Sequence, residues 1–247
     1  FGSDLIRTII LLALTLIVIW LATNKKLKPV PVMAILLVLS SFDLLTVGRR
    51  YLNENTFVDP DEFNNAFAMT DADKMIKQDK GYYRVFNTTV DFTNESITSY
   101  HHNSIGGYHP AKLQIYQDLI ENQIGKNNMQ VLNMLNTKYF IVQNPQNGQP
   151  VAQMNPENFG PCWLVKGIKY VENGKEEMKA LDSTDLRDTA VVQVKFKSLI
   201  PNAPVYDSAS SIKLIENKND IINYESQANS NQFAVFSEVY YTAGWNA

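Results

Sequence analysis

The sequence predicts two transmembrane α-helices followed by an extracytoplasmic α+β domain whose C-terminal part is a truncated, β-sandwich-like layer. Two long apolar runs fall within the first 50 of the 247 residues. The rest of the chain is polar and carries helical and strand patterns, with short strands dominating towards the end. We therefore expect transmembrane helices in 1–50 (about 5–24 and 29–48), an α+β subdomain in 51–142, a linker or loop in 143–161, and a β-rich subdomain in 162–247.

The first apolar run, from Thr8 to Asn24, carries no charge. It has no polar helical face, which suits contact with lipid because a helix satisfies its own backbone hydrogen bonds where water is absent. About 20 residues span a bilayer core, with about 17 as the lower end. Trp20 lies near one end, where an amphipathic ring suits the interface. A secretory signal peptide is disfavoured, because no small-residue cleavage site follows and a second run begins almost at once.

The second run extends from Pro29 to Gly48, with prolines at positions that fit the first turn of a helix. Asp43 is its only charged residue. A carboxylate inside a membrane is a candidate functional group. Near the interface, however, it can reach water or pair with Arg49 or Arg50. A helical hairpin buried inside a soluble protein remains the alternative for both runs.

Charge predicts the orientation of the hairpin. The short segment between the runs carries three lysines (Lys25, Lys26 and Lys28), so the positive-inside rule places it in the cytoplasm and everything after Arg50 outside. Arg49 and Arg50 oppose this orientation. We expect an inner-membrane protein with a periplasmic domain. Residues 1–50 carry a net charge of +4, which leaves −7 on the rest, and such an acidic part excludes nucleic acid as an expected partner.

Local patterns predict the elements of the soluble part in order. Residues 51–69 form an irregular connector with short helical potential, after which a Thr70–Asp73 capping box opens a helix. Helices are expected at Asp71–Gln78, Pro110–Ile124, Met129–Leu135 and Lys175–Asp182. Strands are expected at Tyr82–Asn87, Tyr139–Val142, Cys162–Val165, Ile168–Val171, Val191–Phe196, Ser211–Glu216, Ile221–Glu225 and Phe233–Tyr241. Residues 88–109 read as polar and turn-rich, and we expect the last subdomain to be incomplete.

The three histidines fall within nine residues and suggest a binding site. Aromatic faces beside imidazole and amide groups suit recognition of a polar ligand such as a sugar. The candidate ligand-binding residues are Tyr100, His101, His102, Asn103, Tyr108 and His109. A structured loop that docks these rings on the domain is the alternative. The pair Gly106-Gly107 either lets the backbone approach a ligand closely or forms a turn.

Other chemistry is not predicted. Adjacent His101 and His102 point in different directions and no Asp or Glu lies in the window, so we expect no metal site. Phosphate-binding glycine loops and nucleophile elbows are absent from the sequence, so no catalytic residue and no cofactor is predicted. Cys162 is the only cysteine, which excludes an intrachain disulfide and a cysteine-based zinc site. We expect it to be half-buried rather than reactive.

Several stretches resemble one family. TSYHHNSIGGYHPAKLQIYQDLIE (98–121), followed by VLNMLNTKYFIV (131–142), resembles the YfhO-type family of polytopic bacterial membrane proteins, in the form common in Bacteroidetes. YYRVFN (82–87) and FSEVYYTAGWNA (236–247) are also similar to it, with Thr242-Ala243 where the family has proline. The resemblance covers most of the chain. It implies a larger protein with many spans and a C-terminal extracytoplasmic domain, related to membrane glycosyltransferases that use lipid-linked sugars.

The resemblance also implies a function. Such enzymes carry their catalytic acidic residue on the first extracytoplasmic loop, which is not in this chain, so no catalytic residue is carried over and whether the protein is an enzyme stays open. We expect the C-terminal portion of a glycosyltransferase-like protein of the cell envelope, whose soluble domain positions a glycan or polymer acceptor. Its partners would be the lipid bilayer and a lipid-linked sugar or envelope glycan. The alternative is a non-catalytic envelope protein whose domain binds a protein or cell-wall polymer.

Overall fold

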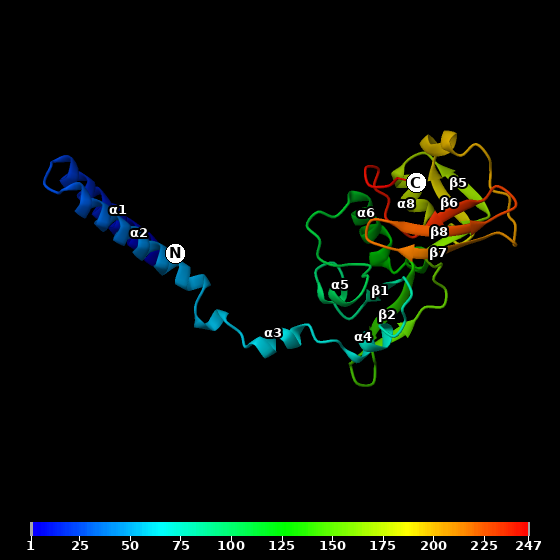
Figure 1. Cartoon of the computed structure of the whole chain (residues 1–247), viewed down its shortest axis with the longest axis horizontal. Helices are drawn as coiled ribbons and strands as arrows, with labels where there is room; N and C mark the ends of the chain where they lie inside the picture. Colours follow the sequence, from blue (N-terminus) through cyan, green and yellow to red (C-terminus); the bar gives the residue numbers. More distant parts are fainter. Residues whose placement is uncertain (1, 247) are drawn as a thin grey trace. The chain divides into compact units, whose positions relative to one another are not determined.

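The computed structural model describes residues 2–246 and divides the chain into two compact units, Phe1–Ala66 and Phe67–Ala247. The first unit begins with two long helices packed side by side, α1 (Gly2–Thr23) and α2 (Pro29–Tyr51) (Figure 1). Two prolines stand in the first turn of α2, as the sequence predicts. After α2 come a single 3₁₀ turn, η1 (Glu54–Thr56), and the short helix α3 (Pro60–Ala66).

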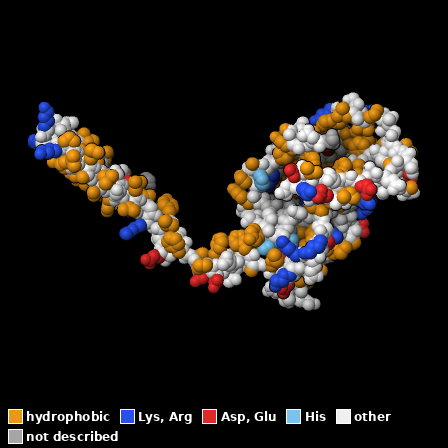
Figure 2. All heavy atoms as spheres, in the orientation of Figure 1, with side chains coloured by type: hydrophobic (Ala, Val, Ile, Leu, Met, Phe, Trp, Pro, Cys, Tyr) orange, Lys and Arg blue, Asp and Glu red, His pale blue; other side chains and the backbone are white. Residues whose placement is uncertain are grey.

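Both long helices are long and apolar enough to cross a membrane. At 1.5 Å per residue, the 22 residues of α1 extend over about 33 Å, which exceeds the hydrocarbon thickness of about 30 Å. Val18 is the only buried residue of α1, and α2 has none. Apolar side chains cover the outside of the pair (Figure 2). A core hairpin of a soluble protein would bury these residues, so their exposure suggests membrane association instead.

Ion pairs join the free ends of the hairpin. Arg7 Nε of α1 lies 3.2 Å from Asp43 Oδ1 of α2, and Arg50 Nη1 donates to Asp4 Oδ2 at 2.8 Å. Asp43 therefore pairs with Arg7. It does not pair with Arg49 or Arg50, the two partners that the sequence suggests. The reason is the antiparallel packing, which brings the first turns of α1 beside the last turns of α2. Sequence proximity does not reveal this pairing.

The second unit opens with helix α4 (Asp71–Ile76), whose Thr70–Asp73 capping box is confirmed. A three-stranded sheet follows, in the order β1 (Arg84–Asn87), β2 (Thr137–Gln143) and β3 (Pro150–Met154). Strands β1 and β2 are parallel, whereas β2 and β3 are antiparallel. The long connection from β1 to β2 contains α5 (Ile97–His101), α6 (Gln114–Asn122), η2 (Ile124–Lys126) and α7 (Met129–Met134) (Figure 1).

The C-terminal strands form three two-stranded sheets. β4 (Cys162–Val165) pairs with β9 (Phe233–Phe236), and β7 (Ser211–Asn217) forms a hairpin with β8 (Ile222–Gln227). β5 (Gly167–Val171) and β6 (Thr189–Gln193) are parallel, connected through helix α8 (Gly174–Ala180), and η3 (Val194–Leu199) follows β6. The second unit is thus a mixed helix-and-sheet domain, as predicted. A sandwich-like packing of its C-terminal part stays a prediction.

Several local expectations differ from the structure. The strand expected over Val191–Phe196 lies at Thr189–Gln193 and is followed by the 3₁₀ helix η3, and residues 88–109, expected to be turn-rich, contain α5. The helix expected over Pro110–Ile124 begins only at Gln114, after a turn, and ends at Asn122. The strand expected over Phe233–Tyr241 ends at Phe236, because the residues of β4 pair only with Phe233 to Phe236. Residues 143–161 are not simply a linker, since they contain β3, which pairs along the exposed edge of β2. Pairing with β4 and with β2 sets the bounds of β9 and β3, respectively.

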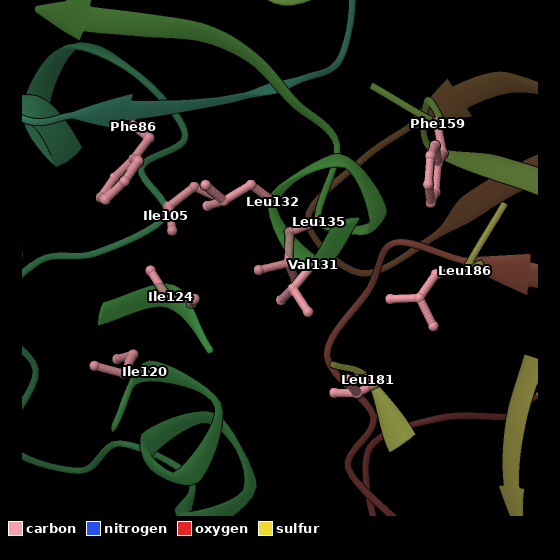
Figure 3. Packing of buried hydrophobic residues seen from close by; sticks show 10 residues of the cluster. All are labelled: Phe86, Ile105, Ile120, Ile124, Val131, Leu132, Leu135, Phe159, Leu181 and Leu186. Atoms are coloured by element: carbon pink, nitrogen blue, oxygen red, sulfur yellow. The ribbon is translucent and has the colours of Figure 1, made fainter. Parts of the chain in front are cut away.

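One apolar cluster holds the second unit together. Ile124, Val131 and Leu132 are almost completely buried in its centre. Phe159, within the predicted linker, and Leu181 and Leu186, beyond it, join the same cluster (Figure 3). The core therefore continues across the boundary that the sequence predicts between 51–142 and 162–247. A second, smaller cluster packs α4 against β1 and β2.

Candidate ligand-binding pocket

The segment after α5 is fixed to the edge of β1. Val85 N donates to Asn103 O at 2.8 Å, and Ile105 N donates to Val85 O at 3.0 Å. Ser104 and Val85 form a parallel bridge. Asn103 and Ile105 thus extend the three-stranded sheet by a short stretch, and this pairing sets the position of the histidine pair directly before it.

The two glycines after this stretch pack against residues 92–95. A Cβ on Gly106 would overlap the carbonyl oxygen of Phe92, so only glycine fits there. Gly107 has a φ of +118°, a left-handed conformation that favours glycine, and its N–H donates to the same Phe92 oxygen at 2.6 Å. Tyr108 N donates to Glu95 O at 3.0 Å. The glycine pair therefore lets its backbone pack closely on another segment of the same chain, and the structure shows no turn at the pair itself.

His102 forms a buried pair with α4. Its Nε2 lies 2.9 Å from Asp73 Oδ1, while Thr70 N and Thr70 Oγ1 donate to Asp73 Oδ2 at 2.8 and 2.6 Å. Burial lowers the pKa of His102 more than the neighbouring carboxylate raises it, so the imidazole is neutral. Burial alone would raise the pKa of Asp73, but the bonds from Thr70 and His102 outweigh it and the pKa is lowered. Asp73 is thus an ionised carboxylate held by three donors.

The neighbouring ring takes a different partner. His101 Nε2 lies 3.0 Å from the carbonyl oxygen of Phe67. The Tyr100 ring packs against both Phe67 and His101, with centroid distances of 5.3 and 5.0 Å. Adjacent histidines therefore point to different groups, as expected, and dock the end of α5 on its own unit. Tyr100 nevertheless remains 69% exposed.

A shallow pocket of about 390 Å³ brings four of the predicted site residues together. Its lining consists of Lys77, Asp79, Lys80, Gly81, Tyr83, Ser99, Tyr100, His101, His102 and Asn103. Tyr108 and His109 do not line it. Tyr108 is 67% exposed elsewhere, and His109 Nδ1 accepts a local bond from Ala111 N at 3.2 Å. The stretch 104–107 separates these two residues from the others along the chain. Ligand binding by all six stays a prediction.

The part of the pocket wall that follows α4 carries charge. Asp79 Oδ2 accepts from Lys138 Nζ at 2.5 Å and from Tyr139 Oη at 3.0 Å, and the lysine bond lowers the pKa of the carboxyl group. Burial raises the pKa of Tyr83 to about 12, so its hydroxyl stays protonated and donates to Ile76 O at 2.8 Å. Lys77 completes a wall with both signs of charge. Such a lining offers donors and acceptors to a polar ligand.

Sequence reasoning missed this wall. Lys77, Asp79 and Tyr83 follow α4, about twenty residues before the histidines, and no motif links the two stretches. The capping box was a partial signal, since it placed Asp73 at the start of a helix. The pairing of 103–105 with β1 and the contact between His102 and Asp73 bring the stretches together.

Two further features bear on the chemistry of the unit. A second pocket of about 410 Å³ lies between α6 and α8 and contains none of the predicted site residues. Cys162 is buried at 7% exposure, and burial raises the pKa of its thiol, which disfavours the reactive thiolate. Within residues 2–246, no group of three or more His, Cys, Asp or Glu side chains could hold a metal ion. The pocket beside Tyr100 is therefore the candidate site.

Comparison with protein-family models, with curated proteins and with solved structures finds no match to this chain.

Proposed function

We propose that α1 and α2 anchor the chain in the inner membrane, with the lysine-rich turn in the cytoplasm and the second unit in the periplasm. Two features support this proposal. Large apolar side chains of both helices are exposed, and Lys25, Lys26 and Lys28 concentrate positive charge at one end of the hairpin. The acidic second unit then lies on the side that the positive-inside rule assigns to it.

The second unit, in this proposal, binds a polar envelope glycan at the pocket beside Tyr100. One observation carries the idea: a largely exposed tyrosine ring borders a pocket that also presents lysine, carboxylate, amide and imidazole groups. The apolar face of a sugar ring packs on an aromatic ring. The hydroxyl groups of the sugar form hydrogen bonds with the surrounding donors and acceptors. A glycan matches both properties of the lining.

The resemblance to the YfhO-type family extends the proposal to the whole protein. The second unit would position a glycan or polymer acceptor for a glycosyltransferase-like protein whose catalytic carboxylate lies outside this chain. The second candidate is a non-catalytic envelope protein. It is favoured by the engagement of both histidine Nε2 atoms in structural contacts, to Phe67 O and to Asp73. An upstream reading frame that encodes further spans and an acidic first outer loop supports the enzyme, whereas a short upstream region supports the binding protein.

Tyrosine substitutions test the binding step. The full chain in nanodiscs is titrated with purified bacterial envelope polysaccharides, and Tyr100→Ala is compared with Tyr108→Ala. Both rings are about equally exposed, at 69% and 67%, but only Tyr100 lines the pocket. Loss of ring packing worth about 1–1.5 kcal/mol weakens binding about tenfold for Tyr100→Ala alone. Equal affinities for both variants, or no polysaccharide binding by the unsubstituted chain, would contradict the proposal.

A further inference from the structure

The connector between α2 and the second unit exposes an unusual number of large apolar side chains. Exposed fractions lie between 55% and 76% for five of them: Tyr51, Leu52, Phe57, Val58 and Phe63. We call these five residues the apolar set of the connector. Soluble proteins rarely leave so dense a group in water, so exposure on this scale marks a surface that another phase or molecule covers.

Continuity with α2 indicates what covers it. Tyr51 is the last residue of α2, so the connector begins where the second span ends. Every position up to Ala66 lies within sixteen residues of that end, and the short elements η1 and α3 leave little of that length extended. Aromatic residues are enriched at the membrane interface, where the ring is half solvated and half in lipid. The connector has aromatic residues at positions 51, 57 and 63.

Charge in the connector is of one sign. Residues 51–66 contain Glu54, Asp59, Asp61 and Glu62 and neither lysine nor arginine. In α3, Asp61 and Phe63 are two residues apart, which places them about 200° apart around a helix of 3.6 residues per turn. The carboxylate and the ring can therefore face water and lipid at the same time, as in interfacial helices.

We propose that residues 51–66 lie in the headgroup region of the same bilayer that α1 and α2 cross, with the apolar set immersed and the carboxylates in water. This inference rests on the membrane placement proposed above. The connector then fixes the depth at which α2 leaves the bilayer. Because it carries no basic residue, it binds a zwitterionic surface better than an anionic one, unlike the common basic interfacial helices.

Single-cysteine labelling of the full chain tests the inference. In a Cys162→Ser background, an environment-sensitive fluorophore is attached after Phe57→Cys or Phe63→Cys, and the protein is reconstituted into phosphatidylcholine vesicles. Asn55→Cys and Asp61→Cys are matched controls, because these residues are also exposed and belong to η1 and α3 respectively. Leu37→Cys, in the middle of α2 and 70% exposed, reports the span itself.

Lipids that carry a quencher near the headgroup should quench the labels at Phe57 and Phe63 about threefold more than those at Asn55 and Asp61, as expected for apolar residues at interfacial depth. Equal, weak quenching at all four connector positions, with Leu37 quenched by deep probes, overturns the inference and leaves the membrane placement intact. Weak quenching at Leu37 as well rejects the placement. Shielding of Phe57 from water without lipid quenching points to a protein partner and also overturns the inference.

Discussion

His102 and Asp73 face each other inside the second unit, with Nε2 and Oδ1 2.9 Å apart and side chains only 4% and 8% exposed. The contact joins the segment after α5 to the first turn of α4. These two stretches position the walls of the candidate pocket, although they are 29 residues apart in the sequence. The pair therefore acts as a positioning contact for the site.

Acid should weaken the fold through this pair. The folded-state pKa of His102 is lowered, so the folded protein resists protonation while the unfolded chain takes up a proton below its ordinary pKa of about 6.5. Stability is thus fully present above that pKa and falls as the pH drops below it. Urea unfolding of the full chain in detergent between pH 8 and pH 5 measures this. His102→Gln should flatten the slope, whereas the exposed His109→Gln should retain it. A stability unchanged by acid would contradict the neutral, buried assignment.

Gly106→Ala should destabilise the second unit by about 3 kcal/mol, because the new methyl group overlaps the Phe92 carbonyl and the backbone has to shift. Gly167→Ala is the matched control, since nothing lies within 4 Å of a Cβ at that position and its φ is not left-handed. Thermal unfolding monitored by near-UV circular dichroism compares the two. Equal melting temperatures would show that the close packing of Gly106 on Phe92 is not required.

Glu238→Ala should also be strongly destabilising. Arg84 Nη2 lies 3.1 Å from Glu238 Oε2, and Tyr82 Oη donates to Oε1 at 2.9 Å. The two charged side chains are only 12% and 16% exposed, so removal of the carboxylate leaves a guanidinium largely buried without its partner, at a cost of about 3 kcal/mol. The double variant Arg84→Met/Glu238→Ala should recover part of the loss in the same melting assay. A double variant less stable than Glu238→Ala would argue against this explanation.

In the hairpin, Arg7→Ala should reduce membrane insertion, because Asp43 then loses its partner in or near the bilayer. An unpaired carboxylate there costs about 1–3 kcal/mol, less than at the bilayer centre. Insertion is measured from glycosylation of engineered acceptor sites in microsomes. Arg7→Ala/Asp43→Ala should insert better than Arg7→Ala, since it removes both charges. If the single and double variants insert equally, the two charges are not coupled.

Local signals predicted the short-range features of the fold well. The capping box of α4, the two long apolar helices and the bounds of β4 depend on residues a few positions apart, so the sequence contains them directly. The different directions of His101 and His102 follow in the same way from their adjacency. These features need no information about distant segments.

Features that depend on distant pairing could not be predicted. β4 pairs with β9 some seventy residues later, and β9 ends at Phe236, opposite Cys162, the first residue of β4. α5 has the sequence ITSYH, which is rich in β-branched and aromatic residues of low helix propensity. Contacts of Thr98, Tyr100 and His101 with other segments stabilise it. Lys77 and Asp79 likewise line the pocket because of contacts between segments that are distant in the sequence. Sequence motifs therefore could not predict half of the residues that line the pocket.

Membrane insertion of the first 51 residues is the claim on which the rest depends. Alkaline carbonate extraction of membranes from cells that express the chain tests it directly, because this treatment releases peripheral proteins and retains those that span the bilayer. With α1 and α2 exposing apolar side chains on all sides, the chain should stay in the membrane pellet and dissolve only in detergent. Recovery of the chain in the carbonate supernatant, as a dispersed protein, would contradict the account.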